Sequence, residues 1–344
     1  MRAARWVLVA VLVAGCGTAP QPAPPAPRPP STPTAPPSGA LPTTPAPPGI
    51  TPFGTPTGTA PPSPSASTAP TCEWQPCYAD AVDDGTLPDS VREASGVAAS
   101  STDPDLYFVV DDGTGAGAVT AVHADGAAVG TVAVDGMDAD NAEALAAGPC
   151  PTGTCLFVGD IGGNGGRDSV SVYRAAEPTV PLPSSVASER WDYAYPDGAF
   201  DAEAMLVTDD GGIVVITKPA GGKTPHRVYT GAAGGGDLVL WATFDPPRPP
   251  SPSRSLVVGN VVTDAARGPG TVLLVTYDQA VEFRAPAPDA DPADFATWEH
   301  RTVPVPTQWQ TEGVTYRAAG GCGYVVVSEK SPMSGPAIGS VACR

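Results

Sequence analysis

The chain has 344 residues, of which 36 are Asp or Glu and 18 are Lys or Arg, so its formal net charge is −18. A general nucleic-acid-binding protein needs a basic face, so this charge excludes that class and no nucleic-acid partner is expected. The composition changes sharply near residue 72, and residues 72–344 amount to one domain's worth of chain.

Residues 1–15 are predicted to be a lipoprotein signal peptide. Arg2 and Arg5 precede an apolar run, 6–14, which is too short to span a bilayer as a permanent helix. The run ends in Val13-Ala14-Gly15-Cys16, which resembles the lipobox of bacterial lipoproteins. This resemblance implies cleavage before Cys16 and lipidation of that cysteine, which would hold the protein on the extracytoplasmic side of the cell membrane. The alternative is an ordinary secretory signal with a chance cysteine.

Residues 16–71 are predicted to be the lipidated cysteine followed by a linker. From Gly17 to Thr71 almost every residue is Pro, Ala, Thr, Ser or Gly, and Arg28 is the one charged residue. Such a segment cannot bury enough apolar surface to offset its ordering entropy, so we expect a disordered tether with polyproline II character.

A short phrase recurs in the remaining part of the chain, in which an acid is followed by a tiny residue and a short apolar run. The acids of the five copies are Glu93, Glu143, Glu203, Asp264 and Glu312, at steps of 50, 60, 61 and 48 residues. This period is typical of β-propeller blades. The sequence therefore predicts an all-β fold in which each phrase is the innermost strand of a blade in a five-bladed propeller.

Continuous β-branched or aromatic runs follow the phrases by about ten residues. These predicted second strands are Leu106–Val110, Cys155–Val158, Gly212–Ile216, Thr271–Val275 and Tyr324–Val327. Runs of this kind indicate strands that are buried on both faces. The last blade lacks a clear outer strand. Residues 73–91 are expected to supply it, unless they contain a degenerate sixth blade.

The cysteines after Cys16 fall into neighbouring pairs. The expected disulfides are Cys72–Cys77, Cys150–Cys155 and Cys322–Cys343. Six cysteines allow fifteen pairings, so this choice depends on adjacency alone. The expected export makes disulfides favourable. Zinc is disfavoured, because none of the three histidines lies at ligand spacing.

Acids on five innermost strands would all face one central channel. Several carboxylates crowded on an axis repel one another unless a cation joins them. Calcium suits such a site, because it takes about 6–8 oxygen ligands in irregular geometry. The predicted ligands are Ser95, Glu143, Glu203, Asp264 and Glu312. The alternative is that these acids accept hydrogen bonds from the backbone of the next blade and only lock the ring.

Polar residues also gather where the second strands end. The predicted ligand-binding residues are Asp111, Asp112, Asp160, Asn164, Lys218, Tyr277, Asp278 and Lys330. In a propeller, the end of the second strand lies on the same face as the start of the first, so these residues should surround the channel mouth. Two lysines beside a bound metal would suit an anionic group. The alternative is that they only balance the acids.

These phrases resemble those of a group of exported actinobacterial β-propeller proteins, which are mostly uncharacterised. The resemblance lies in Glu93–Gly96, Leu106–Gly113, Asn141–Leu145, Val158–Asn164, Asp201–Ala204 and Glu312–Val314. The ring is also similar to that of calcium-dependent apyrases, which are five-bladed propellers with one calcium ion on the axis. This similarity implies calcium near Ser95, Glu143, Glu203, Thr263 or Asp264, and Glu312.

Two functions remain open at this stage. The first is a membrane-tethered binding or scaffold module for a small-molecule, cell-wall or protein ligand, with a structural calcium ion. The second is a calcium-dependent hydrolase of phosphate or related esters at the channel mouth. The first is preferred, because propellers host many functions and a fold alone does not confer activity.

Overall fold

The structure is a computed structural model that describes residues 72, 74–113, 117–163, 165–220, 225–250, 260–318, 321–330 and 334–344. These residues belong to one compact unit, Thr68–Arg344. The predicted signal peptide, Cys16, the linker and Asn164 lie outside the described residues. Within them, no helix has the length and apolar character needed to cross a membrane.

The described strands form five four-stranded antiparallel blades, which confirms the predicted propeller. The outer strands of blades 1 and 2, 128–135 and 185–194, also pair in parallel, so these two blades share one continuous sheet. From the innermost strand outward, blade 1 consists of β2 (Ala94–Ala99), β3 (Leu106–Asp111), β4 (Ala118–His123) and β5 (Ala128–Asp135). Blade 2 is β6 (Ala142–Pro149), β7 (Thr154–Asp160), β8 (Ser169–Ala176) and β9 (Ser185–Ala194).

The remaining blades follow the same order. Blade 3 is β10 (Ala202–Val207), β11 (Ile213–Thr217), β12 (His226–Gly231) and β14 (Val239–Phe244). Blade 4 is β15 (Val262–Gly268), β16 (Thr271–Thr276), β17 (Ala280–Arg284) and β18 (Glu299–Val303). A short 3₁₀ helix, η2 (Pro292–Thr297), precedes β18, and the two-residue strand β13 (Gly236–Asp237) pairs with β9.

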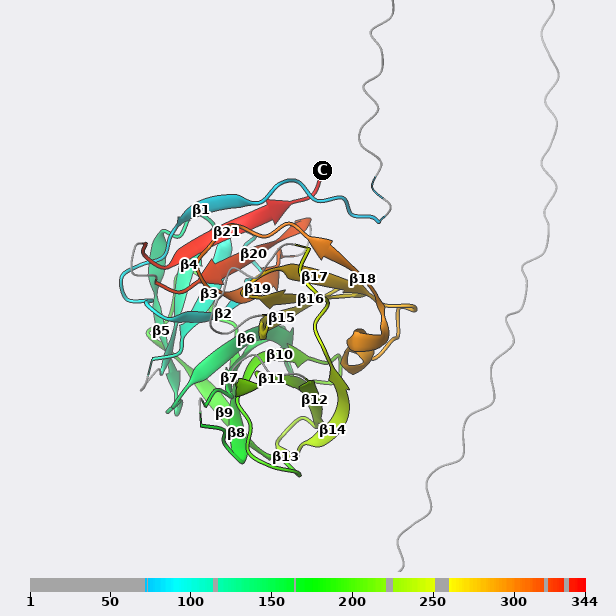
Figure 1. Cartoon of the computed structure of the whole chain (residues 1–344). Helices are drawn as coiled ribbons and strands as arrows, with labels where there is room; N and C mark the ends of the chain where they lie inside the picture. The colour runs from blue at the N-terminus through cyan, green and yellow to red at the C-terminus, as the bar shows by residue number, and fades with distance from the viewer. Residues whose placement is uncertain are drawn as a thin grey trace, which may run out of the picture. The chain divides into compact units, whose positions relative to one another are not determined.

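Blade 5 closes the ring with strands from both ends of the unit. It contains β19 (Thr311–Tyr316), β20 (Gly323–Ser328), β21 (Ala337–Ala342) and, outermost, β1 (Val82–Thr86). Strand β1 pairs antiparallel with β21, from Val82 opposite Ser340 to Thr86 opposite Ala337. Figure 1 shows this blue strand beside the red one. The segment before the first phrase therefore supplies the missing outer strand, as predicted.

The five innermost strands surround the axis in the order β2, β6, β10, β15 and β19, and β19 contacts β2 again (Figure 1). Small residues allow this crowding. A Cβ added to Gly96 of β2 would lie 2.4 Å from the backbone nitrogen of Leu145 in β6. A larger side chain at this position would therefore push two inner strands apart.

The apolar core lies between the blades as five separate clusters. Each cluster joins side chains from two neighbouring blades, and the fifth joins blade 5 to blade 1. Large side chains such as Phe108, Phe157 and Tyr324 are completely buried. The second strands are covered on both faces, which explains why they are continuous apolar runs rather than alternating ones.

The three predicted disulfides are present as Cys72–Cys77, Cys150–Cys155 and Cys322–Cys343. The first two close short loops, because their cysteines are separated by 5 residues. The third joins cysteines that are 21 residues apart and ties the start of β20 to the end of β21.

Replacing both Cys322 and Cys343 by Ser should lower the free energy of unfolding by about 3 kcal/mol, because the longer loop gains more entropy in the unfolded chain. The matched Cys150→Ser/Cys155→Ser pair should cost about 2 kcal/mol. Urea denaturation of both variants checks this order. A larger loss from the Cys150/Cys155 pair would contradict it.

Candidate functional site

A β-bulge occurs at the same position in all five innermost strands. In each blade the pairing of the first two strands skips one residue of the inner strand, directly after its first residue. The skipped residues are Ser95, Glu143, Glu203, Thr263 and Glu312. A bulge leaves its extra residue unpaired and re-aims its side chain. We call these five residues the inner ring.

Asp264 is one residue out of register with the glutamates, because Thr263 occupies the bulge of blade 4. Its Oδ2 accepts a hydrogen bond of 2.8 Å from the backbone N–H of Val314 in blade 5. Asp264 is 1% exposed, and burial raises its pKa well above its usual value. This hydrogen bond joins blade 4 to blade 5. It corresponds to the alternative considered above, in which a ring acid accepts a hydrogen bond from the backbone of the next blade. The Thr263 hydroxyl donates to the carbonyl of Thr311, also in blade 5.

The second strands end at matching positions as well. Asp111, Asp160, Thr217, Thr276 and Ser328 each pair with the first residue of their inner strand. The residues that follow them are Asp112, Ile161, Lys218, Tyr277 and Glu329. We call these five the outer ring. Backbone N–H groups of Asp112, Lys218 and Glu329 donate to carbonyls just before the inner ring, so the two rings are adjacent.

The three glutamates of the inner ring are buried with little positive charge beside them. Glu143, Glu203 and Glu312 are 7%, 5% and 4% exposed. Burial, and then neighbouring carboxylates, raise the pKa of Glu143 to about 9. Burial is also the largest cause of the raised pKa of Glu203 and of Glu312, and each value rises to about 8. Carboxylates that retain protons near neutral pH are suited to exchange them for a bound cation.

Lys218 supplies the one positive charge that pairs with an inner-ring acid among the described residues. Its Nζ donates to Oε1 of Glu203 at 2.6 Å and to the hydroxyl of Tyr277 at 2.8 Å. Burial alone would lower the pKa of Lys218, but Glu203, Tyr277 and Glu312 raise it, so the ammonium stays charged. Lys218 and Tyr277, two of the predicted ligand-binding residues, therefore contact each other on the side of the mouth formed by blades 3 and 4.

The opposite side of the mouth, formed by blades 5, 1 and 2, is a cluster of acids. Oxygen atoms of Glu93, Asp111 and Asp112 lie within 4.8 Å of one another. Asp112 Oδ1 is buried and has no hydrogen-bond partner among the described residues. Burial, followed by Glu93, Glu329 and Asp111, raises the pKa of Asp112 to about 7. The charge of the mouth is thus uneven, neutralised on one side and crowded with carboxylates on the other.

Gln310 connects the two rings on the acidic side. Its Nε2 donates to Oε1 of Glu312 at 3.2 Å and to Oε2 of Glu329 at 2.8 Å. Glu329 follows its second strand by the same step as Lys218. The sequence places it among the polar residues at the strand ends, although it is not one of the predicted ligand-binding residues. Sequence reasoning missed Gln310 as a site residue. Gln310 carries no comparable signal.

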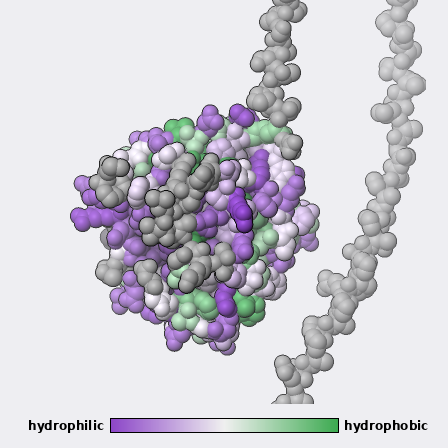
Figure 2. All heavy atoms as spheres, viewed as in Figure 1, coloured by the Kyte–Doolittle hydropathy of each residue, from purple (hydrophilic) through white to green (hydrophobic). Residues whose placement is uncertain are grey.

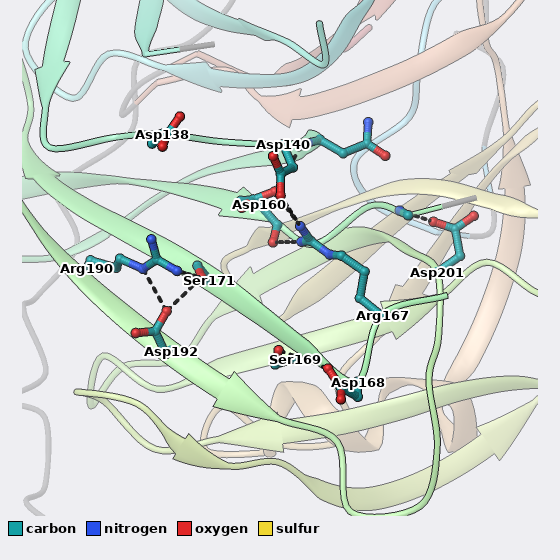
Figure 3. Close-up of polar contacts among 12 residues, drawn as sticks. Asp138, Asp140, Asp160, Arg167, Asp168, Ser169, Ser171, Arg190, Asp192 and Asp201 are labelled. Carbon is teal, nitrogen blue, oxygen red and sulfur yellow. Dashed lines mark hydrogen bonds and ion pairs between the residues drawn. The ribbon is translucent and has the colours of Figure 1, made fainter. Parts of the chain in front are cut away.

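Asp160 makes structural contacts, and Figure 3 shows its carboxylate beside the guanidinium of Arg167. Its Oδ1 accepts from the backbone N–H of Asn141 and from the guanidinium of Arg167, both at 3.0 Å. Asp111 has the corresponding role in blade 1, since its Oδ2 accepts from the N–H groups of Arg92 and Glu93. Both aspartates therefore fix the segment that leads into the inner strand.

The other predicted residues lie at the edge of the site. The Lys330 side chain is exposed, and its backbone N–H donates to the carbonyl of Arg92. The backbone N–H of Asp278 donates to the hydroxyl of Thr276. Figure 2 shows hydrophilic residues over much of the described surface in this view, in keeping with the net charge of the chain.

The position of Glu143 in the inner ring explains why residue 162 is a glycine. A Cβ on Gly162 would lie 2.4 Å from Cγ and 2.6 Å from Oε1 of Glu143. The backbone of blade 2 therefore passes directly against this glutamate, and any side chain at position 162 would displace the carboxylate.

No protein-family model matches this chain, and no curated protein matches it. Among solved structures, it is similar to regucalcin from Agrobacterium tumefaciens strain C58, a calcium-binding protein, at 10% identity and a TM-score of 0.42 over 78% of this chain and 96% of that one. It is similar to the α-L-arabinofuranosidase of Lactobacillus brevis at 11% identity and a TM-score of 0.44, over 75% of this chain and 92% of the enzyme. It is also similar to the Malassezia sympodialis allergen Mala s 1, at 10% identity and a TM-score of 0.44 over 77% of this chain and 96% of the allergen. With every TM-score below 0.5, no ligand or substrate of these proteins carries over.

Without divalent cations, the stability of the protein should decrease as the pH rises from about 5 to about 8. The unfolded glutamates titrate near 4.5, whereas folded Glu143 keeps its proton to about 9. Between these values the folded chain binds more protons than the unfolded chain, so raising the pH favours unfolding. Urea denaturation in EDTA should therefore show a shallower pH slope for Glu143→Gln than for the wild type. Equal slopes would contradict this expectation.

Lys218→Met should destabilise the protein by up to about 3–5 kcal/mol at pH 8, because it leaves Glu203 buried without its partner. The loss should be smaller at pH 5, where Glu203 is protonated in the folded chain. Thermal melts at the two pH values measure the difference. Lys330→Met, which removes an exposed lysine, is the matched control and should be nearly neutral at both.

Proposed function

We propose that the propeller is a cation-dependent binding module whose calcium ion is held at the acidic side of the channel mouth. The observation that carries this proposal is the imbalance of charge at the inner ring. Three buried glutamates face the axis, and Lys218 pairs with one of them among the described residues. Glu143 and Glu312 form no ion pair with the described residues. Their polar neighbours include the Ser95 hydroxyl and the Gln310 amide, and the Lys218 ammonium acts on both without pairing with either.

The residues present fit a hard cation. The described side chains on the acidic side offer oxygen atoms as metal ligands, from the carboxylates of Glu143, Glu312, Asp112 and Glu329 and the hydroxyl of Ser95, with Glu93 and Asp111 beside Asp112. Asp112 Oδ1 is a buried acceptor for which the described part of the chain supplies no partner. Oxygen donors from several strands suit calcium, which accepts irregular geometry, better than zinc, which prefers nitrogen and sulfur. The bound ion would supply the positive charge that these carboxylates lack.

The two sides of the mouth would then have different roles. Lys218 stabilises ionised Glu203 on one side, so this glutamate is less available as a metal ligand. Glu143 and Glu312 lie on either side of Ser95 in the ring order, which places the proposed ion near blade 1. An ion at this position, across the mouth from the ammonium of Lys218, would present a second positive group to an incoming anionic or polyhydroxylated ligand.

The predicted lipid anchor completes the proposal. Cys16 and the Pro-rich residues 17–71 would hold the propeller on the outer side of the membrane, at a distance set by an extended chain of about 3.1 Å per residue. A tethered propeller would meet cell-wall or protein ligands there. Mass spectrometry of the membrane fraction would reveal a diacylated peptide that begins at Cys16. An unmodified mature N-terminus at another residue would contradict the anchor.

Calcium should raise the melting temperature of the EDTA-treated protein by roughly 5–10 °C at about a hundredfold excess over its dissociation constant. Binding to the folded state alone produces such a shift. Glu143→Gln and Glu312→Gln should each remove most of it, because each takes away one ligand charge. Differential scanning calorimetry measures the shift.

Glu299→Gln provides the matched control, since Glu299 is an exposed glutamate at the start of the outer strand of blade 4. This variant should respond to calcium like the wild type. If calcium leaves the melting temperature of the wild type unchanged, the metal proposal fails. The ring acids would then be inter-blade hydrogen-bonding groups, as Asp264 already is.

A further inference from the structure

The far end of the central channel contains a cavity that is separate from the acidic mouth. Its volume is about 730 Å³, and all five blades line it. In each inner strand the lining begins two residues beyond the inner ring, at Val97, Leu145, Met205, Ala265 and Val314. The cavity therefore lies on the axis at the opposite end of these strands from the glutamates.

The walls of this cavity are mostly apolar. Leu145, Met205, Val207 and Val314 contribute bulky surface, while small residues such as Ala147 leave the axis open. Ligand pockets for small molecules usually have volumes of about 300–1,000 Å³, apolar walls and a few polar groups. This cavity has both the volume and the walls of such a pocket.

Three charged side chains line the cavity, and two of them form ion pairs with other described residues. Arg267 forms a bidentate ion pair with Asp209, at 2.6 and 2.7 Å. The Glu282 carboxylate pairs with Arg301 at 2.6 Å. The third, Arg317, forms no ion pair with the described residues, and its Nε is buried without an acceptor.

We propose that this cavity binds an amphipathic organic anion, a carboxylate with an apolar chain, whose head group pairs with Arg317 and whose chain lies along the apolar walls. The guanidinium matches a carboxylate in two parallel hydrogen bonds. Residues 1–71 of the chain itself contain no Asp or Glu, so this segment offers no carboxylate side chain to Arg317. The ligand is therefore a separate molecule.

The test is isothermal titration calorimetry of the protein with decanoate in EDTA, below the micelle concentration. EDTA prevents calcium carboxylates and keeps this test independent of the acidic mouth. The wild type should bind decanoate and should bind decyltrimethylammonium and octyl glucoside far more weakly. Arg317→Met, which keeps an apolar side chain of similar length, should weaken decanoate binding at least about tenfold, because a charge-assisted hydrogen bond is lost.

Two further variants complete the test. Ala147→Phe fills the cavity from an exposed position and should also abolish decanoate binding while Arg317 remains. Arg248→Met removes an exposed arginine that does not line the cavity and should bind like the wild type. Far-UV circular dichroism confirms that each variant is folded. No binding by the wild type, equal binding of the cationic or neutral amphiphile, or unchanged binding by Arg317→Met or Ala147→Phe would each overturn the proposal.

Discussion

The close approach of five inner strands around one axis is the constraint on which the rest of the structure depends. Their backbones can meet only where side chains are small, as at Gly96. The bulge at the start of each strand then turns one side chain per blade towards the axis. The same crowding that forms the ring therefore also concentrates Glu143, Glu203 and Glu312 in a small buried volume. Their raised pKa values are a direct result.

The two ends of the channel differ because the inner strands change character along their length. Near their first residues they carry carboxylates and hydroxyls, and from the fourth residue onward they are mainly apolar. Because the strands surround the axis in the same direction, this gradient is repeated in every blade. One end of the molecule is consequently a polar mouth rich in carboxylates, whereas the other is an apolar cavity with a single unpaired guanidinium among the described residues.

Much of this architecture was predictable from the sequence, because a repeat of about 50–60 residues and five doubly buried strands leave few alternatives to a propeller. The closing strand was predictable because the last blade lacks an outer strand in its own part of the sequence. The disulfides were predictable because the cysteines lie in neighbouring pairs. The register of blade 4 was not predictable in this way. An acidic residue at position 264 imitates the phrase, and only strand pairing reveals that the bulge lies at Thr263. Similarly, no sequence pattern shows that Asp160 turns to Arg167 or that Gln310 joins Glu312 to Glu329.

The way in which the ring closes also determines when the protein can become complete. Strand β1 is made near the beginning of the unit, but its partner β21 is at the very end. A chain that emerges from its N-terminus can assemble blades 1 to 4 from local hairpins, while β1 must wait for the last residues. Contacts between such distant segments are slow to form. Until they do, the edge of blade 5 is open to other chains, so the final step of folding is the one most exposed to mispairing.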